Sequence, residues 1–214
     1  MNDTGDPPES RPRRDSAASK RRLLAAAADE FAARGIAGAR VDRIASAAQA
    51  NKRLIYDYFG DKDGLFDAVM DINMDTVIEA NPMDANDLPG YAGRWFDYSR
   101  EHPDEMRLFD WARLELRLGP IALGKRTQSY RSRLAAIEAA QREGTVSTRL
   151  SPEQILMVIE SLCVGWLSTT PPFLAAADTH TPERRNPQPL LGNEGELSRA
   201  REVIVDTVRR LTTS

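Results

Sequence analysis

The sequence has few of the side chains that form disulfides or bind metals. Cys163 is the single cysteine, and His102 and His180 are the two histidines among 214 residues. One cysteine excludes an internal disulfide and favours the reducing cytoplasm as the compartment. Neither histidine belongs to an HExxH motif, in which two histidines on one helix face bind zinc. We therefore expect a cytoplasmic protein without a metal site.

Long apolar runs and cofactor motifs are also missing. No stretch approaches the roughly 20 consecutive apolar residues of a membrane-spanning helix. The opening MNDTGDPPESRPRR lacks the apolar segment of a secretory signal. The full P-loop motif GxxxxGK[S/T], the dinucleotide-binding motif GxGxxG and the nucleophile motif GxSxG do not occur. These absences predict a protein with no membrane partner and no cofactor, and they argue against an enzyme.

Positive charge is concentrated near the N-terminus. Residues 11–62 contain 12 Lys and Arg against 6 Asp and Glu, a net charge of +6. The whole chain has a net charge of −3, which leaves −9 for the remainder. This asymmetry indicates a basic end that faces nucleic acid and a separate acidic body, or else a basic tail on an ordinary protein. The arginines of residues 1–15 would either supplement DNA binding or form a spectator arm.

Apolar residues recur with helical spacing along the chain. Leu23, Ala27 and Phe31 lie four residues apart and would share one helix face. No segment shows the alternation of a β-strand, so the predicted fold class is all-α. Residues 1–15 are polar and proline-containing, which predicts disorder. Helices are expected at 16–34, 41–48, 52–58, 62–79, 104–118, 120–143, 152–169 and 194–211, with a proline-rich loop at 171–193.

Three short helices with tight turns between them occupy residues 16–61, the arrangement of a helix-turn-helix DNA-binding domain. In that arrangement the third helix enters the major groove, which is about 12 Å wide. Lys52, Arg53 and Leu54 begin this helix and would meet base edges. The hydroxyls of Tyr56 and Tyr58 would reach phosphates.

Charged residues around the third helix have more than one interpretation. Lys62 begins the fourth helix, where its ammonium and the helix N-terminus could hold one phosphate. Asp57 repels phosphates; we expect it to pair with Arg53, four residues earlier, rather than to accept from a cytosine amino group. Arg43 on the second helix is compatible with a DNA contact and with a solvated surface.

A distinctive motif spans residues 41–65. It reads Val41-x-x-Ile44-Ala45-x-x-Ala48, then Asn51, then Ile55-Tyr56-x-Tyr58-Phe59-x-x-Lys62-x-x-Leu65. From about residue 20 to 66 the chain resembles the TetR family of repressors, whose motif ends in Y-x-Y-F-x-x-K-x-x-L. The resemblance implies a homodimer that binds a double-stranded DNA operator and responds to an unidentified small-molecule ligand.

The chain departs from the family motif around the second helix. Arg40, which we count among the DNA-contacting residues, replaces the Thr or Ser that usually caps this helix. Gln49 replaces the turn glycine, and Asn51 replaces the serine that caps the third helix. Asparagine caps as well as serine. Gln49 would have to adopt the backbone angles of the glycine, at a cost of about 1 kcal/mol if φ is positive.

The remaining residues, 62–214, would form a helical ligand-binding and dimerisation domain, as the resemblance implies. Binding pockets are mostly apolar with a few placed polar groups. Candidate wall residues are Trp95, Trp111, Glu115 and Trp166, although for any single one of them plain core packing is the favoured alternative. Residues 152–168 are apolar on nearly every face and 195–211 carry an apolar stripe, so we expect these two helices to form the dimer interface. The alternative is a monomer that buries both helices internally.

Two other functions remain open from the residues alone. One is a DNA-binding architectural protein without a ligand. The other is an all-α enzyme with catalytic carboxylates such as Glu115 and Glu160 in a cavity. Release of DNA by a small molecule would favour the repressor, and turnover of that molecule would favour the enzyme.

Overall fold

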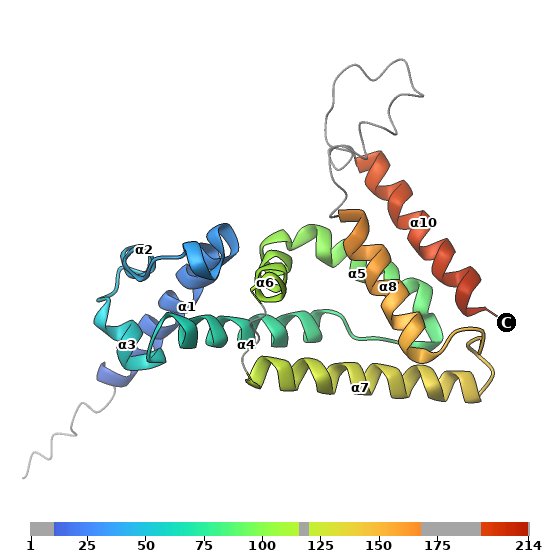
Figure 1. Ribbon diagram of the computed structural model, residues 1–214, viewed down its shortest axis with the longest axis horizontal. Helices are drawn as coiled ribbons and strands as arrows, with labels where there is room; N and C mark the ends of the chain where they lie inside the picture. Colours follow the sequence, from blue (N-terminus) through green and yellow to red (C-terminus); the bar gives the residue numbers. More distant parts are fainter. Residues whose placement is uncertain (1–10, 116–119, 168–193, 214) are drawn as a thin grey trace, which may run out of the picture. The chain divides into compact units, whose positions relative to one another are not determined.

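The computed structural model describes residues 11–115, 120–167 and 194–213. These ranges contain helices and no strand, which confirms the all-α prediction (Figure 1). Residues 1–10 of the expected arm and the whole of the expected loop at 171–193 lie outside them. The helices are α1 (Arg11–Gly38), α2 (Val41–Ala47), α3 (Arg53–Phe59), α4 (Lys62–Ala80), η1 (Ala85–Asp87), α5 (Leu88–Glu101), α6 (Pro103–Leu114), α7 (Pro120–Arg142), α8 (Pro152–Leu167) and α10 (Glu194–Thr212).

The chain divides into two compact units. The first comprises residues 1–75 and 104–124, and the second comprises residues 76–103 and 125–214. The sequence-based division, a DNA-binding domain at 16–61 and a body at 62–214, differs from these units in two ways. Residues 62–75, most of α4, and nearly all of α6 belong to the first unit.

The first unit is built on a core that the helical spacing predicted. Leu23, Ala27 and Phe31 of α1 are completely buried. The ring of Phe31 meets that of Phe66 of α4 edge to face, with centroids 5.1 Å apart. Ile44, from α2, and Ile55, from α3, complete the same cluster. This core fixes α3 against α1 and leaves its opposite face outside. Helix α1 starts at Arg11, within the segment for which disorder was expected.

The turn between α2 and α3 contains the positive φ angle that the sequence suggested for Gln49. Gln49 has a φ of 49°, which places a non-glycine residue in the left-handed region. Arg22 of α1 supports this turn by donating from Nε to the carbonyl oxygen of Ala48, at 3.1 Å. Asn51 caps α3 as predicted, because its Oδ1 accepts from the backbone N–H of Arg53 at 2.8 Å.

We predict that Gln49→Gly stabilises the first unit. Glycine adopts positive φ without strain, so the free energy of unfolding should rise by about 1 kcal/mol, less whatever glycine adds to the entropy of the unfolded chain. Ala33→Gly on the exposed side of α1 is the matched control and should lower it by about 1 kcal/mol. Denaturant unfolding at fixed protein concentration measures both. Equal effects of the two variants would contradict this account of the turn.

The second unit packs α5 against α8 and α10, and α8 also contacts α10 (Figure 1). Tyr91 and Phe96 of α5 are buried there, together with Ile159 of α8 and Ile204 of α10. The ion pair between Asp97 of α5 and Arg201 of α10 closes to 2.7 Å. Among the helices that the described ranges contain, none is long and apolar enough to cross a membrane.

Candidate nucleic-acid interface and ligand site

The outer face of α3 carries exposed side chains that can contact DNA. The Arg53 side chain is 84% exposed, and Tyr56 is 46% exposed although it is a large aromatic residue. Leu54 is half-buried against the core of the first unit. Arg53 and Tyr56 are therefore the exposed residues of α3 that can donate hydrogen bonds to DNA, and Asp57 beside them is exposed as well.

The basic residues at the start of α3 have carboxylate partners within the protein. The Lys52 ammonium lies 2.7 Å from the Asp42 carboxylate of α2, which raises the pKa of Lys52. Arg53 lies 3.8 Å from Asp57, which confirms the pairing predicted from their spacing. Both pairs are exposed, and exposed pairs of this kind contribute little to stability. Their cations can therefore exchange these partners for phosphate or base oxygens at small cost.

Tyr58 is held differently from Tyr56. Its ring packs at the edge of the first unit's core, and its hydroxyl lies 2.9 Å from Oγ of Ser16 in α1. The hydroxyl thus has a partner within the protein, whereas the sequence predicted a contact with a DNA phosphate. Ser16 and Tyr58 together link the start of α1 to the end of α3.

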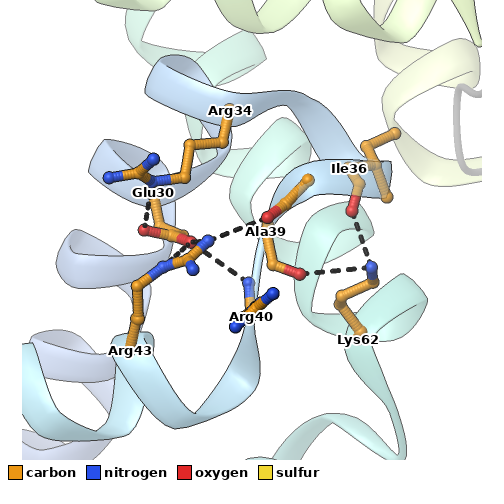
Figure 2. Close-up of polar contacts among 8 residues, drawn as sticks. Glu30, Arg34, Ile36, Ala39, Arg40, Arg43 and Lys62 are labelled. Carbon is orange, nitrogen blue, oxygen red and sulfur yellow. Dashed lines mark hydrogen bonds and ion pairs between the residues drawn. The ribbon is translucent and has the colours of Figure 1, made fainter.

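Arg40 and Arg43 converge on Glu30 of α1 (Figure 2). Arg43 Nε donates to Glu30 Oε1 at 2.7 Å, and its NH2 group donates to the carbonyl oxygen of Gly38 at 2.8 Å. The backbone N–H of Arg40 donates to the same Glu30 oxygen at 3.1 Å, while its side chain is exposed. Helix α2 has no side-chain cap, as the replacement of the usual Thr or Ser implied. Arg43 therefore joins α2 to α1, and Arg40 is the one of the two that faces solvent.

The position of Lys62 differs from the predicted phosphate contact. Its ammonium is turned inward and donates to the carbonyl oxygens of Ile36, at 2.7 Å, and Ala39, at 3.4 Å (Figure 2). These carbonyls belong to the chain beyond the kink of α1, where few backbone partners are available. Asp61 meanwhile caps α4 by accepting from the N–H of Gly64. Lys62 therefore ties the start of α4 to the end of α1 in this structure.

We predict that Glu30→Gln destabilises the first unit in a pH-dependent way. The Arg43 hydrogen bond lowers the pKa of Glu30, so the folded protein binds its proton less readily than the unfolded chain does. Hydrogen bonds to charged groups contribute about 1.5–3 kcal/mol. The variant should lose that amount above about pH 5. The difference should close as the pH falls through the usual Glu value of about 4.3 and below it.

Unfolding titrations from neutral to acidic pH measure this difference. Asp29→Asn is the matched control, because Asp29 is the exposed neighbour of Glu30 and loses the same charge. It should stay within about 0.5 kcal/mol of the parent protein. A loss for Glu30→Gln that is independent of pH would contradict the assignment.

Two residues expected in a ligand pocket instead contact the end of α1. Trp111 Nε1 donates to the carbonyl oxygen of Ala32 at 3.2 Å. Glu115 Oε1 accepts from the backbone N–H groups of Ile36, at 3.1 Å, and Ala37, at 3.4 Å. All of these residues belong to the first unit. In this structure Trp111 and Glu115 satisfy backbone groups beside the kink in α1, and their place in a pocket wall stays a prediction.

The other two expected pocket residues lie in the second unit but differ in burial. Trp95 is 8% exposed and its ring stacks on that of Tyr98, whereas Trp166 is 41% exposed on α8. From the sequence we missed Ser99, one turn after Trp95 on α5, and Arg133, whose guanidinium lies beside the Tyr91 ring. The spacing Tyr91-x-x-x-Trp95-x-x-x-Ser99 was a usable signal, because it places three polar atoms on one helix face.

Apolar side chains remain exposed on the two helices expected at the dimer interface. On α8, Met157 is 68% exposed and Val164 is 39% exposed, while Ile155, Ile159 and other residues of that helix are buried. On α10, Val203 is 50% exposed. Met157 and Val164 are seven residues apart and share a helix face. The second unit therefore presents an apolar surface that its described residues, 76–103, 125–167 and 194–213, do not cover.

Comparisons with known proteins match both parts of the chain to family models. Residues 23–69 match the model described as bacterial regulatory proteins of the tetR family. Residues 87–210 match a model described as a Tetracyclin repressor-like C-terminal domain. The two matches cover the helix-turn-helix and the helices α5 to α10.

Similar whole proteins come from bacteria. HTH-type transcriptional repressor SCO4008 of Streptomyces coelicolor is 35% identical over 159 residues, 74% of this chain and 82% of that protein. HTH-type transcriptional repressor NicS of Pseudomonas putida is 28% identical over 172 residues, 72% of this chain and 79% of that protein. The crystal structure of the transcriptional regulator SCO4942 of Streptomyces coelicolor aligns with a TM-score of 0.73 at 34% identity, covering 91% of this chain and 98% of that one.

Proposed function

The chain belongs to the TetR family of transcriptional regulators, and from that premise we propose that it represses transcription by binding a pseudo-palindromic operator as a homodimer until a small molecule releases it. The observation that carries this proposal is the exposed outer face of α3, with Arg53 and Tyr56, in a segment whose net charge is positive. Such a helix can enter the major groove while the surrounding cations attract phosphates.

Within this proposal the residues around α3 divide into readers and supports. Arg53 presents its guanidinium at the N-terminal end of α3, where bidentate contact with a guanine is possible. Lys52 and Tyr56 are placed for phosphate contacts, which position the helix without reading sequence. Arg43 and Lys62 support the reader from within the protein, because their donors bind Glu30 and the backbone of residues 36–39.

Dimerisation would place two copies of α3 on one DNA. A two-fold axis between protomers matches the two-fold symmetry of a palindrome, and each copy of α3 would read one half-site. The uncovered apolar surface of α8 and α10 supports an interface there, since exposed patches of this kind mark contacts with partners.

The proposed ligand acts by favouring one arrangement of the protein over another. A molecule that binds the conformation with low DNA affinity shifts the population toward it, and a few kcal/mol of differential affinity suffice. We assign no catalytic role. Of the two carboxylates considered, Glu115 accepts from backbone N–H groups and Glu160 accepts from the Tyr130 hydroxyl. Turnover of the bound molecule would contradict this part of the proposal. We place the protein in the cytoplasm, where it reaches DNA.

The experiment that tests this function is a titration of variants against operator and scrambled DNA at several salt concentrations. Arg53→Ala should cost about 1–3 kcal/mol of operator binding and relax the preference at one base pair in each half-site. Arg34→Ala is a close control, because Arg34 is also an exposed arginine in an i,i+4 ion pair, with Glu30 of α1. It should change both DNAs alike. If Arg53→Ala leaves affinity and preference as they were, α3 is not the reading helix.

A further inference from the structure

Three buried polar atoms on α5 have no hydrogen-bond partner among the residues that the structure describes. They are the hydroxyl of Tyr91, Nε1 of Trp95 and Oγ of Ser99. The three residues are 0%, 8% and 3% exposed, so water outside the protein does not reach them freely. Buried polar groups in proteins are almost always hydrogen-bonded, and exceptions call for an unseen water or ligand. Three exceptions on one helix define a specific site.

The three atoms share one face of α5. Their residues are four apart, so successive side chains advance by about 6 Å along the axis and turn by about 40°. Gly93 and Asp97 lie on another side of the helix, where they meet Arg201 of α10. The unpartnered row is therefore separate from the surface that α5 uses to pack on α10. An elongated molecule on this row would meet a hydrogen-bonding group at each turn of the helix.

A nearly buried arginine stands beside one end of the row. The Arg133 side chain is 12% exposed, and its guanidinium carbon lies 5.7 Å from the centre of the Tyr91 ring. Its nearest carboxylate oxygen, Oε1 of Glu160, is 3.7 Å away, which is too long for a hydrogen bond. The other oxygen of Glu160 accepts from the Tyr130 hydroxyl at 2.7 Å. The guanidinium of Arg133 therefore keeps N–H donors to offer.

The row and the arginine together offer donors. Trp95 Nε1 can only donate, and Arg133 has no acceptor. Burial raises the pKa of Tyr91 to about 12, so its hydroxyl keeps its proton and can donate at neutral pH. Arg133 would repel a positively charged ligand, and Glu160 already accepts a hydrogen bond from the Tyr130 hydroxyl. A ligand with a negative charge or strong acceptor at one end fits these groups.

We propose that the effector of this repressor is an organic acid whose carboxylate binds Arg133 and the Tyr91 hydroxyl while its remaining atoms lie along Trp95 and Ser99. The role of effector rests on the proposed repressor function, whereas the binding site itself is inferred from the geometry of the second unit alone. A bidentate guanidinium–carboxylate pair would supply the charge, and the neutral donors of α5 would select the length and polarity of the rest.

The test compares acids with neutral and cationic molecules of the same shape. The probes are octanoate with octanamide and octylamine, and phenylacetate with phenylacetamide, titrated calorimetrically into the full-length protein. We expect at least one acid to bind about tenfold more tightly than its amide. Arg133→Met should remove that preference. Arg131→Met, the exposed neighbour on α7, should keep it.

Tyr91→Phe gives a second, independent readout. The variant deletes a hydroxyl that has no partner in the ligand-free protein, so its Tm should rise or stay unchanged while acid binding weakens several-fold. A residue that only supports the fold would give the opposite change in Tm. A lower Tm for Tyr91→Phe would overturn the proposal, and so would tighter binding of octylamine or failure of every acid to bind.

Operator release is measured separately, so the two proposals can fail independently. Acid binding that leaves operator affinity unchanged would retain the site but overturn its role as the effector site. Release of the operator by another molecule, with no acid bound, would overturn this inference and leave the repressor function intact.

Discussion

Gly35→Ala should lower the free energy of unfolding by about 2–6 kcal/mol, because a methyl group at this position meets two obstacles. Gly35 has φ 67° and ψ 176°, a region of backbone space that is open almost only to glycine. A Cβ there would also lie 2.8 Å from Cε3 of Trp111. Trp111 cannot easily retreat, since its Nε1 is hydrogen-bonded to the carbonyl oxygen of Ala32. Denaturant unfolding of the parent and the variant measures the loss.

Gly60→Ala separates the two obstacles. Gly60 also has a positive φ, 81°, but an added Cβ would have no atom within 4 Å. Its variant should show the backbone cost alone, about 1–3 kcal/mol. Combining Gly35→Ala with Trp111→Ala should recover the steric part, which a double-mutant cycle reports as a coupling energy. Equal losses in the free energy of unfolding for Gly35→Ala and Gly60→Ala, with no coupling to Trp111, would contradict the predicted steric clash between Trp111 and a side chain at position 35.

Val164→Glu on α8 should separate the dimer and with it abolish tight operator binding. In a two-fold interface each substitution places two charges in one apolar contact, one from each protomer. Burying charges without partners costs at least about 3 kcal/mol, which raises the dimer dissociation constant about 100-fold or more. Operator affinity should fall with it, because a single protomer holds only one half-site. Sedimentation over a range of protein concentrations measures the first effect and a DNA titration the second.

Gln128→Glu is the control for the introduced charge. Gln128 is exposed on α7, outside the predicted interface, and its variant should dimerise and bind DNA like the parent. Met157→Glu, on the same face of α8 as Val164, should behave like Val164→Glu. A Val164→Glu protein that stays dimeric would contradict the prediction that α8 forms part of the dimer interface.

The sequence alone predicted the parts of the molecule that depend on short-range pattern. Spacing of four residues identified the buried face of α1, and the same spacing identified the Arg53–Asp57 pair. Asn51 was recognisable as a cap because capping needs only a side-chain oxygen one turn from the first N–H groups. Gln49 was recognisable as strained from the glycine that usually stands there.

Partners distant in the sequence were the part that pattern could not supply. Glu115 binds backbone groups 79 and 78 residues away, and Lys62 binds carbonyls 26 and 23 residues away. These contacts exist because the kink at Gly35 ends the regular hydrogen bonding of α1 and exposes backbone groups. No sequence spacing relates a single carboxylate or ammonium to a backbone partner so far away along the chain. The sequence therefore predicted external partners for both residues, a small-molecule ligand for Glu115 and a DNA phosphate for Lys62.

The central claim, that two copies of α3 read a palindrome, is tested most directly by selecting bound sequences from random double-stranded DNA with the purified full-length protein. We predict a pseudo-palindrome whose half-site centres lie about one helical turn, or a multiple, apart, on the order of 34–36 Å per turn. Repeating the selection with Arg53→Ala should blur one symmetry-related pair of positions and leave the spacing unchanged. A selected motif without two-fold symmetry, or no enrichment of any sequence, would contradict the claim.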